Sequence, residues 1–186
     1  MTNWYMDEKK LVQEVLSGSD AALKMLIEKY ERLVAHMVGR VVPVVMDKEE
    51  ICQDVFIKVY TKLSEFNFES KLSTWIATIA YRMAVNFAKK RKPDSVELEE
   101  ISFRVNDSFM SPDEEDMKRF VHSLVGQLPL NYRSVLTMFY LEGFSYPEIV
   151  EITGMPEGTV KNYIHRAKHK LKVIVSKYSK KEIALL

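Results

Sequence analysis

The chain has very little cysteine and no long hydrophobic run. Cys52 is its single cysteine among 186 residues, so no internal disulfide can form. No apolar run approaches the roughly 20 residues that span a bilayer, and no apolar segment follows a basic stretch at the N-terminus. The sequence therefore predicts a cytoplasmic protein with no signal peptide and no direct membrane insertion. Cys52 lies in a helical pattern, which favours a small buried or half-buried filler.

Net charge is also low, at +1, but the charges are unevenly distributed. Residues 1–92 carry 15 Lys and Arg against 12 Asp and Glu, residues 93–116 carry one against nine, and residues 117–186 carry 11 against five. An acidic middle between two basic blocks indicates two domains and a linker. The net charge alone would not reveal a nucleic-acid binder of this kind.

Helical periodicity runs through almost the whole chain, and no strand-period stretch of any length is present. We predict an all-α fold of two small helical domains, over residues 1–92 and 113–180, joined by an acidic linker over residues 93–112 and followed by a tail over residues 181–186. The expected helices cover residues 6–17, about 20–42, 47–63, 73–90, 113–126, 129–141, 145–153 and 156–176, with fraying from Lys177 onward.

The third and fourth predicted helices each have an apolar stripe. The third begins at Asp47 and Glu50, which are spaced as in a capping box. Its inward stripe is Ile51, Val55, Val59 and Leu63. The buried side of the fourth is expected to hold Trp75, Ile76, Ile79, Ala80, Met83 and Phe87. These stripes allow residues 6–92 to bury a four-helix core.

Residues 145–168 predict a helix, a tight turn and a second helix with a basic outer face. Ser145 and Glu148 are spaced as a capping box, and Gly154 supplies the turn because it accepts a positive φ without strain. This is the helix-turn-helix arrangement, whose second helix enters the major groove of DNA. The alternative is a basic, solvated helix with no partner.

The second helix of this pair has an apolar and a polar face. The apolar stripe recurs at steps of four and three residues: Val160, Ile164, Ala167, Leu171 and Ile174. The outward residues that suit phosphates or base edges are Lys161, Asn162, His165, Arg166, Lys168, His169, Lys170 and Lys172. Gly158 lets the helix N-terminus approach a phosphate closely, and the helix dipole favours that anion.

The segment from Phe66 to Lys92 interleaves aromatic and basic residues, the combination that holds single-stranded nucleic acid. Stacking one base on a ring contributes roughly 1–3 kcal/mol, comparable to the cost of unstacking it, so such a surface can help open a duplex without ATP. The alternative is structural, because Trp75 and Phe87 lie on an apolar stripe and residues 89–92 complement a helix end. The better candidates for base contacts are the loop residues Ser70, Lys71, Leu72, Ser73 and Thr74.

These stretches resemble bacterial sigma factors, in particular the extracytoplasmic-function group of the sigma-70 family. Residues 49–60 resemble the segment that grips core RNA polymerase, and residues 68–80 resemble the promoter-melting segment. Residues 128–133, 140–149 and 154–161 resemble the C-terminal domain. The blocks occur in the order of a group that keeps only these two domains.

The resemblance implies a role for each set of residues. Those expected to bind core polymerase, at the β′ clamp helices, are Glu50, Gln53, Asp54, Phe56, Lys58 and Tyr60. Those expected to bind the opened −10 element are Phe68, Ser70, Lys71, Leu72, Ser73, Thr74, Trp75, Tyr81, Arg82 and Lys89. Those expected to read the −35 duplex are Gly158, Thr159, Lys161, Asn162, His165, Arg166 and Lys168. The implied partners are core polymerase, including its β flap, promoter DNA, and an anti-sigma factor of a kind that is often membrane-bound.

Four residues depart from the usual pattern of the family: Thr78, Arg82, Asn86 and Tyr163. The first three bear on the identity of the −10 base, and Tyr163 bears on the −35 contacts. None of them affects the expected fold.

Two other function classes are open to the sequence. A stand-alone helix-turn-helix regulator would sense a ligand or dimerise through its N-terminal half, which gives no reason to pair Gln53 and Asp54 with an aromatic and basic loop. An enzyme would need a site, but no phosphate-binding Gly-rich loop is present, and His165 and His169, four apart on one helix, lack a third metal ligand. We therefore expect a promoter-specificity subunit that is not an enzyme and needs no metal or cofactor.

Overall fold

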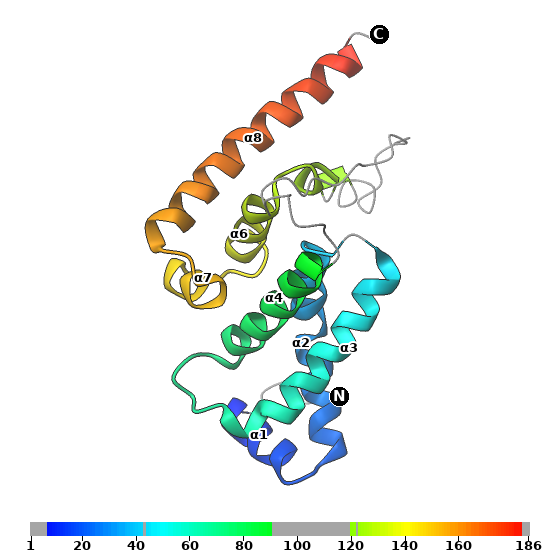
Figure 1. Ribbon diagram of the computed structural model, residues 1–186, viewed down its shortest axis with the longest axis vertical. Helices are drawn as coiled ribbons and strands as arrows, with labels where there is room; N and C mark the ends of the chain where they lie inside the picture. Colours follow the sequence, from blue (N-terminus) through cyan, green and yellow to red (C-terminus); the bar gives the residue numbers. More distant parts are fainter. Residues whose placement is uncertain (1–6, 43, 91–119, 122, 184–186) are drawn as a thin grey trace. The chain divides into compact units, whose positions relative to one another are not determined.

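The computed structural model describes residues 7–42, 44–90, 120–121 and 123–183, and the regular structure in these ranges is entirely helical (Figure 1). The all-α prediction is confirmed. The chain divides into two compact units, Met1–Ala88 with Glu151–Thr153, and Lys89–Val150 with Gly154–Leu186. Each helix is described below with the unit that holds most of it. The predicted linker over 93–112 lies outside the described residues, so the predicted domain limits remain predictions.

The first unit is built from four helices and a short 3₁₀ helix. These are α1 (Glu8–Leu16), α2 (Asp20–Gly39), α3 (Val45–Lys62), η1 (Leu63–Glu65) and α4 (Leu72–Lys90). Helix α2 packs against both α1 and α3, and Figure 1 shows α4 running beside α2. The predicted stripe of α3 is confirmed, since Ile51, Val55, Val59 and Leu63 are all buried.

Helix α3 begins earlier than predicted and without a capping box. Its N-cap residue is Val44, which makes no side-chain capping hydrogen bond. The prediction of a cap at Asp47 and Glu50 is therefore wrong. Extended backbone at Val44 leads directly into the helix, which leaves Asp47 buried in the first turn, where the helix dipole favours a carboxylate.

The buried face of α4 is rotated from the predicted one. Trp75, Ile79, Met83 and Phe87 are only half-buried. The enclosed residues are Leu72, Thr74, Ile76, Ala77, Ala80, Tyr81 and Ala84. The three alanines present a flat surface that allows close helix packing, so α4 turns this smaller face to the core.

The second unit contains α6 (Leu130–Tyr140), α7 (Tyr146–Thr153) and α8 (Glu157–Ile183), and residues 120, 121 and 123–126 before them are helical. Helices α6 and α8 pack together. Their shared core holds Val125, Leu128, Tyr132, Leu136 and Ala167, with Tyr163, Leu171 and Ile174 packed against it. The predicted apolar stripe of α8 is thereby confirmed.

Arg133 holds the turn that precedes α6. Its guanidinium is fully buried, and Nη1 donates to the carbonyl oxygens of Gly126 at 3.4 Å and Leu128 at 3.3 Å. A buried cation that bonds backbone carbonyls at the end of one helix fixes where the next begins. Arg133 therefore stabilises the approach to the helix-turn-helix.

Helix α8 continues farther than predicted. The structure is helical to Ile183, so the expectation of fraying from Lys177 is wrong as far as Ile183, and residues 184–186 lie outside the description. After Gly158 the chain has neither glycine nor proline, and nothing local ends the helix.

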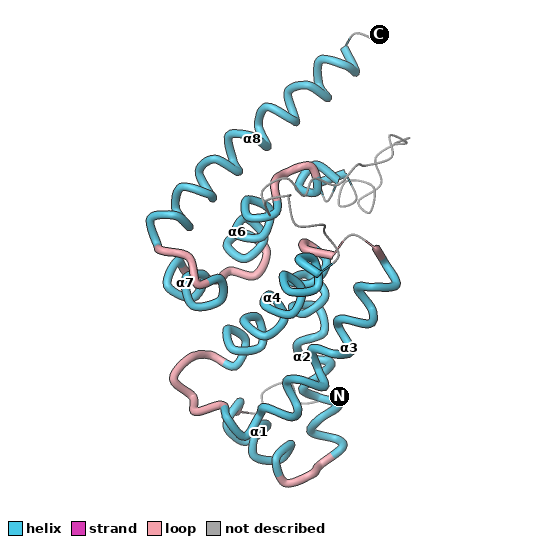
Figure 2. Tube along the Cα trace, in the orientation of Figure 1, coloured by secondary structure: helices cyan, strands magenta, loops and turns pink. Residues whose placement is uncertain are grey.

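Figure 2 shows the two loops that join α6 to α7 and α7 to α8. In the second, Gly154 has φ +72, and no atom lies within 4 Å of where a Cβ would stand. Replacing Gly154 by Ala should therefore destabilise the helix-turn-helix through backbone strain alone, by about 1 kcal/mol. Amide hydrogen exchange across α7 and α8 measures this loss.

Gly158→Ala is the matched control. Gly158 has equally open space but lies within α8 without a positive φ, so alanine there should leave stability unchanged or raise it. Equal protection of α7 and α8 in both variants would contradict the strain argument.

Candidate nucleic-acid interfaces

The first helix of the helix-turn-helix is fixed by its own ends. The predicted capping box is present: Ser145 N donates to Glu148 Oε2 at 2.7 Å, and Glu148 N donates to Ser145 Oγ at 3.4 Å. Gly154 ends the helix in the left-handed conformation. The predicted inward residues Ile149 and Ile152 are fully buried. Local sequence alone therefore sets where α7 starts and stops.

Helix α8 presents the predicted −35 residues outward. Lys161, Asn162, His165, Arg166 and Lys168 are all exposed, as is Gly158, while Thr159 is half-buried. Val160, Ile164 and Ala167, on the opposite side, are buried. The structure thus gathers donors suited to phosphates and base edges on one helical face.

His169 and Lys172, which the sequence places on the outward face but which are not among the predicted −35 residues, are exposed on the same face. His169 lies four residues after His165 and seven after Asn162, and Lys172 follows after another turn. The face therefore extends farther along α8 than the recognition residues that were predicted.

Tyrosine rings and a carboxylate hold the lysines of this helix. Lys161 Nζ lies 2.6 Å from Glu157 Oε1 and 5.4 Å from the centre of the Tyr146 ring. The hydrogen bond and the charge of Glu157 raise the pKa of Lys161. Lys168 Nζ lies 5.9 Å from the centre of the Tyr140 ring. These contacts orient the ammonium groups before any ligand arrives.

Tyr163, which departs from the family pattern, belongs to the core rather than to the outer face. Its ring lies 5.1 Å from that of Tyr132, and it packs against the buried cluster of the second unit. A tilted aromatic pair of this kind contributes more to stability than the burial of its apolar area alone would give. Tyr163 therefore leaves the outward face of α8 intact.

In the first unit, an aromatic cluster lies at the loop between η1 and α4. The ring centres of Phe66 and Phe68 are 4.7 Å apart, and those of Phe66 and Trp75 are 5.4 Å apart. Phe66 is buried, Trp75 is half-buried and Phe68 is 40% exposed. The cluster therefore has a buried base and an exposed aromatic edge, as base stacking requires.

The structure separates the predicted −10 residues into two groups. Phe68, Lys71, Arg82 and Lys89 are exposed, and Ser70, Ser73 and Trp75 are half-buried. Leu72, Thr74 and Tyr81 are buried on the core side of α4. Because α4 starts at Leu72 and turns that side inward, the side chains of these three residues pack in the core and cannot meet a base in this conformation.

A carboxylate of α1 binds the start of α4. Glu8 Oε1 accepts hydrogen bonds from Tyr30 Oη at 2.7 Å and Lys29 Nζ at 3.2 Å, and the backbone N–H of Leu72 also acts to lower the pKa of Glu8. Burial acts to raise the pKa of Glu8, but these hydrogen bonds and the Lys29 charge outweigh it and lower the pKa from 4.5. Burial and the hydrogen bond to Glu8 raise the pKa of Tyr30.

The outer face of α3 carries the residues predicted to bind polymerase. Glu50, Gln53, Asp54, Lys58 and Tyr60 are exposed, and Phe56 is half-buried. Sequence reasoning missed Ile57 and Met46, which are 62% and 79% exposed among these polar residues. Ile57 lies opposite the buried stripe of α3, and an apolar residue at that position was a signal that could have been used.

Neither a membrane-spanning helix nor a metal-ligand cluster is present among the described residues. No helix among them is long and apolar enough to cross a membrane. No group of three or more His, Cys, Asp or Glu within the described ranges could hold a metal ion.

Two protein families match the chain, one in each unit. The family described as sigma-70 region 2 matches residues 26–94, and the family described as sigma-70, region 4 matches residues 121–171. The two stretches contain the loop before α4 and the helix-turn-helix.

Among curated proteins, the chain is similar to sigma factors over most of its length. It is 32% identical over 177 residues to the RNA polymerase sigma-H factor of Pseudomonas aeruginosa, covering 87% of this chain and 90% of that protein. It is 31% identical over 175 residues to the ECF RNA polymerase sigma-E factor of Escherichia coli, covering 88% and 91%.

Two solved structures share the fold. One is CnrH in complex with the cytosolic domain of CnrY, with a TM-score of 0.66 and 19% identity over 90% of this chain and 96% of that one. The other is the sigma factor RpoE in complex with the anti-sigma factor NepR from Bartonella quintana, with a TM-score of 0.63 and 22% identity over 82% and 96%.

Acidification should lower the stability of the first unit by protonating Glu8. Because its folded-state pKa lies below 4.5, the stabilisation from Glu8 is complete above that pH and is lost as the pH falls through the lowered value. Glu8→Gln should therefore destabilise the unit at about pH 7. The difference in unfolding free energy between the variant and the parent should become smaller below pH 4.5. Urea unfolding followed by tryptophan fluorescence measures this, since Trp4 and Trp75 are the only tryptophans.

Glu14→Gln is the matched control on the same helix. Its carboxylate lies 3.9 Å from the exposed Lys10, a weaker surface pair, so its effect should be smaller at every pH. If the difference in unfolding free energy between Glu8→Gln and the parent stays constant down to about pH 3, protonation of Glu8 is not linked to the stability of the unit.

Proposed function

The chain belongs to the extracytoplasmic-function group of the sigma-70 family and is an RNA polymerase sigma factor, and we propose that three of its surfaces divide the work of promoter recognition. The outer face of α3 binds core polymerase. The loop before α4 captures the opened −10 strand. The outer face of α8 reads the −35 element as a duplex.

The −35 surface rests on the exposed side of α8. Asn162, His165 and Arg166 carry the donors that can meet base edges in the major groove. Lys161, Lys168 and the backbone at Gly158 and Thr159 suit phosphates, because the start of a helix favours an anion. The −35 residues proposed are Gly158, Thr159, Lys161, Asn162, His165, Arg166 and Lys168, together with His169 and Lys172.

The −10 surface rests on the aromatic cluster and the cations around it. Phe68 offers an exposed ring, and Lys71 and Arg82 offer exposed charges on the loop and on α4. Rings stack on bases and cations follow the phosphates of a single strand. The residues proposed are Phe68, Ser70, Lys71, Ser73, Trp75, Arg82 and Lys89, without the buried side chains of Leu72, Thr74 and Tyr81.

The polymerase surface rests on the mixed character of the outer face of α3. Ile57 and Met46 supply exposed apolar contact, and Gln53 and Asp54 supply polar partners on the same side. An apolar centre with a polar rim is typical of a protein interface. We assign this face to the β′ clamp helices, and we assign the second unit to the β flap.

An anti-sigma factor is the further partner that we propose. The RpoE structure that shares this fold contains the anti-sigma factor NepR, and that of CnrH contains the cytosolic domain of CnrY. A regulator that covered α3 or α8 would block access to polymerase or to the −35 duplex. We propose that this partner is attached to the membrane and that the present chain acts in the cytoplasm.

One observation carries the proposal: the same unit combines an exposed polar and apolar face on α3 with an aromatic and basic loop. The alternative, a stand-alone helix-turn-helix regulator, uses neither feature. Such a regulator would bind promoter duplex without retaining core polymerase, so a pull-down of core polymerase by the purified chain decides between the two.

Arg166→Ala should weaken promoter binding by roughly 1–3 kcal/mol, because it removes a donor expected at a base edge. The promoter is obtained by mapping transcription start sites after overproduction of the chain, and the affinity for a labelled −35 duplex is measured by fluorescence anisotropy. Arg32→Ala, on the exposed side of α2, is the control and should leave the affinity unchanged. Equal affinity of the Arg166 variant and the parent argues against this contact.

Asp54→Lys should reduce retention of core polymerase by about tenfold or more, since a reversed charge within an interface meets like charge or loses its partner. Binding of the −35 duplex by the same variant should be unchanged. Glu31→Lys makes the same charge reversal at an exposed site on α2 and should keep polymerase binding. If both variants retain polymerase as the parent does, α3 is not the docking face.

A further inference from the structure

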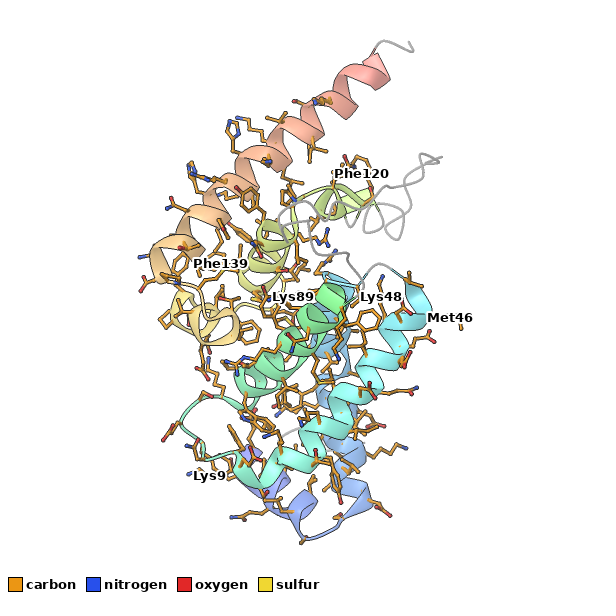
Figure 3. All side chains as sticks on the ribbon, viewed as in Figure 1. Lys9, Met46, Lys48, Lys89, Phe120 and Phe139 are labelled. Carbon is orange, nitrogen blue, oxygen red and sulfur yellow. The ribbon has the colours of Figure 1, made fainter. Side chains whose placement is uncertain are left out.

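The loop that precedes α4 is contacted by α1, which is far from it in the sequence. Lys9 Nζ lies 5.8 Å from the centre of the Phe68 ring, and Figure 3 shows Lys9 beside this loop. The neighbouring Glu8 faces Leu72, the first residue of α4, whose backbone N–H acts to lower the pKa of the Glu8 carboxyl group. Two adjacent residues of α1 thus hold both the tip of the loop and its exit into the helix.

The contacts of Glu8 fix α1 against two other elements. Tyr30 and Lys29 of α2 donate to the same carboxylate that binds the start of α4. The first N–H groups of a helix need acceptors, and a carboxylate is favoured there by the helix dipole. Glu8 thereby ties the position of α4 to the packing of α1 on α2.

Phe68 is held in an uncommon backbone conformation. Its φ is +61, the left-handed region that bulky side chains rarely adopt. Asn67 Oδ1 accepts from Glu69 N at 3.3 Å, and the Phe66 ring packs on Phe68 from below. Such a conformation persists only where neighbouring contacts determine it.

We propose that Glu8 and Lys9 are positioning residues that preorganise the loop for capture of the opened strand. The inference rests on the proposed role of the loop and adds a part of the chain to it, because α1 lies before residues 26–94, which match region 2 of the family. Lys9 keeps the Phe68 ring turned toward solvent, and Glu8 fixes the point where the loop joins α4. A loop already in its binding shape loses less conformational freedom when the base arrives.

The contact between Lys9 and Phe68 joins two exposed side chains, so its role differs from that of packing in the core. Phe68 is 40% exposed and Lys9 is exposed, so their contact contributes little to the stability of the unit. A residue that acted only on stability would affect polymerase binding and strand capture together. Loss of the Lys9 contact should affect strand capture alone, whereas loss of the Glu8 carboxylate also lowers the stability of the unit.

The test compares full-length variants bound to core polymerase. Base extrusion is followed by the fluorescence of 2-aminopurine placed in the non-template −10 strand of a mapped promoter. Lys9→Met should slow it about threefold, and Glu8→Gln about fivefold. Lys9→Arg keeps a cation over the ring and should restore the parent rate.

Two substitutions on the outer side of α1 are the matched controls. Lys10→Met and Glu14→Gln break an exposed pair on the same helix and should open promoters at the parent rate. Thermal unfolding and polymerase retention of Lys9→Met should equal those of the parent. If Lys9→Met opens promoters at the parent rate, or if it loses polymerase binding to the same extent as opening, the inference is overturned.

A variant of the loop itself shows whether a negative result rules out only the positioning role of Glu8 and Lys9 or the proposed function of the loop as well. Lys71→Ala tests whether the loop acts on the opened strand at all. If Lys71→Ala opens promoters at the parent rate, the loop has no such role. If Lys71→Ala is slow and both α1 variants are normal, the loop functions and only the positioning by Glu8 and Lys9 is wrong.

Discussion

Burial of one stripe of side chains fixes the direction of every other side chain on the helices that carry function. On α8, burial of Val160, Ile164 and Ala167 sends Asn162 and His165 to the opposite side, because a turn takes 3.6 residues. On α3, the stripe that contains Val55 and Val59 places Ile57 outward in the same way. Neither face needs a further contact to orient it. A cavity in either stripe would therefore act on binding as well as on stability.

The loop before α4 is the exception, because no helical period determines the direction of its side chains. Its shape depends on contacts between elements: Phe66 packs beneath Phe68, and two residues of α1 reach its tip and its end. Irregular segments that hold a ligand need such external support, since their backbone lacks the repeating hydrogen bonds of a helix. The loop proposed to bind the opened strand is thus also the functional surface that depends most on tertiary structure.

This difference decides what the sequence could predict. The cap at Ser145, the turn at Gly154 and the stripe of α8 were predictable because each depends on spacing within a few residues. The buried face of α4 was not, because packing against neighbouring helices overrode the local pattern. The start of α3 was not, because the helix begins after Val44 without a side-chain cap. The contact between Glu8 and the start of α4 joins positions distant in the sequence, and no local pattern contains it.

The lysines of α8 show why cations alone would discriminate poorly between DNA sequences. Lys161 is already paired with Glu157 and lies over Tyr146, so binding a phosphate exchanges one anionic partner for another and gains less than a free charge would. The ring contacts limit the freedom of the side chains before binding, which reduces the entropy lost in the complex. In the proposed −35 complex, phosphate contacts would set the register of the helix, and discrimination between bases would be left to Asn162 and Arg166, which can pair with base edges.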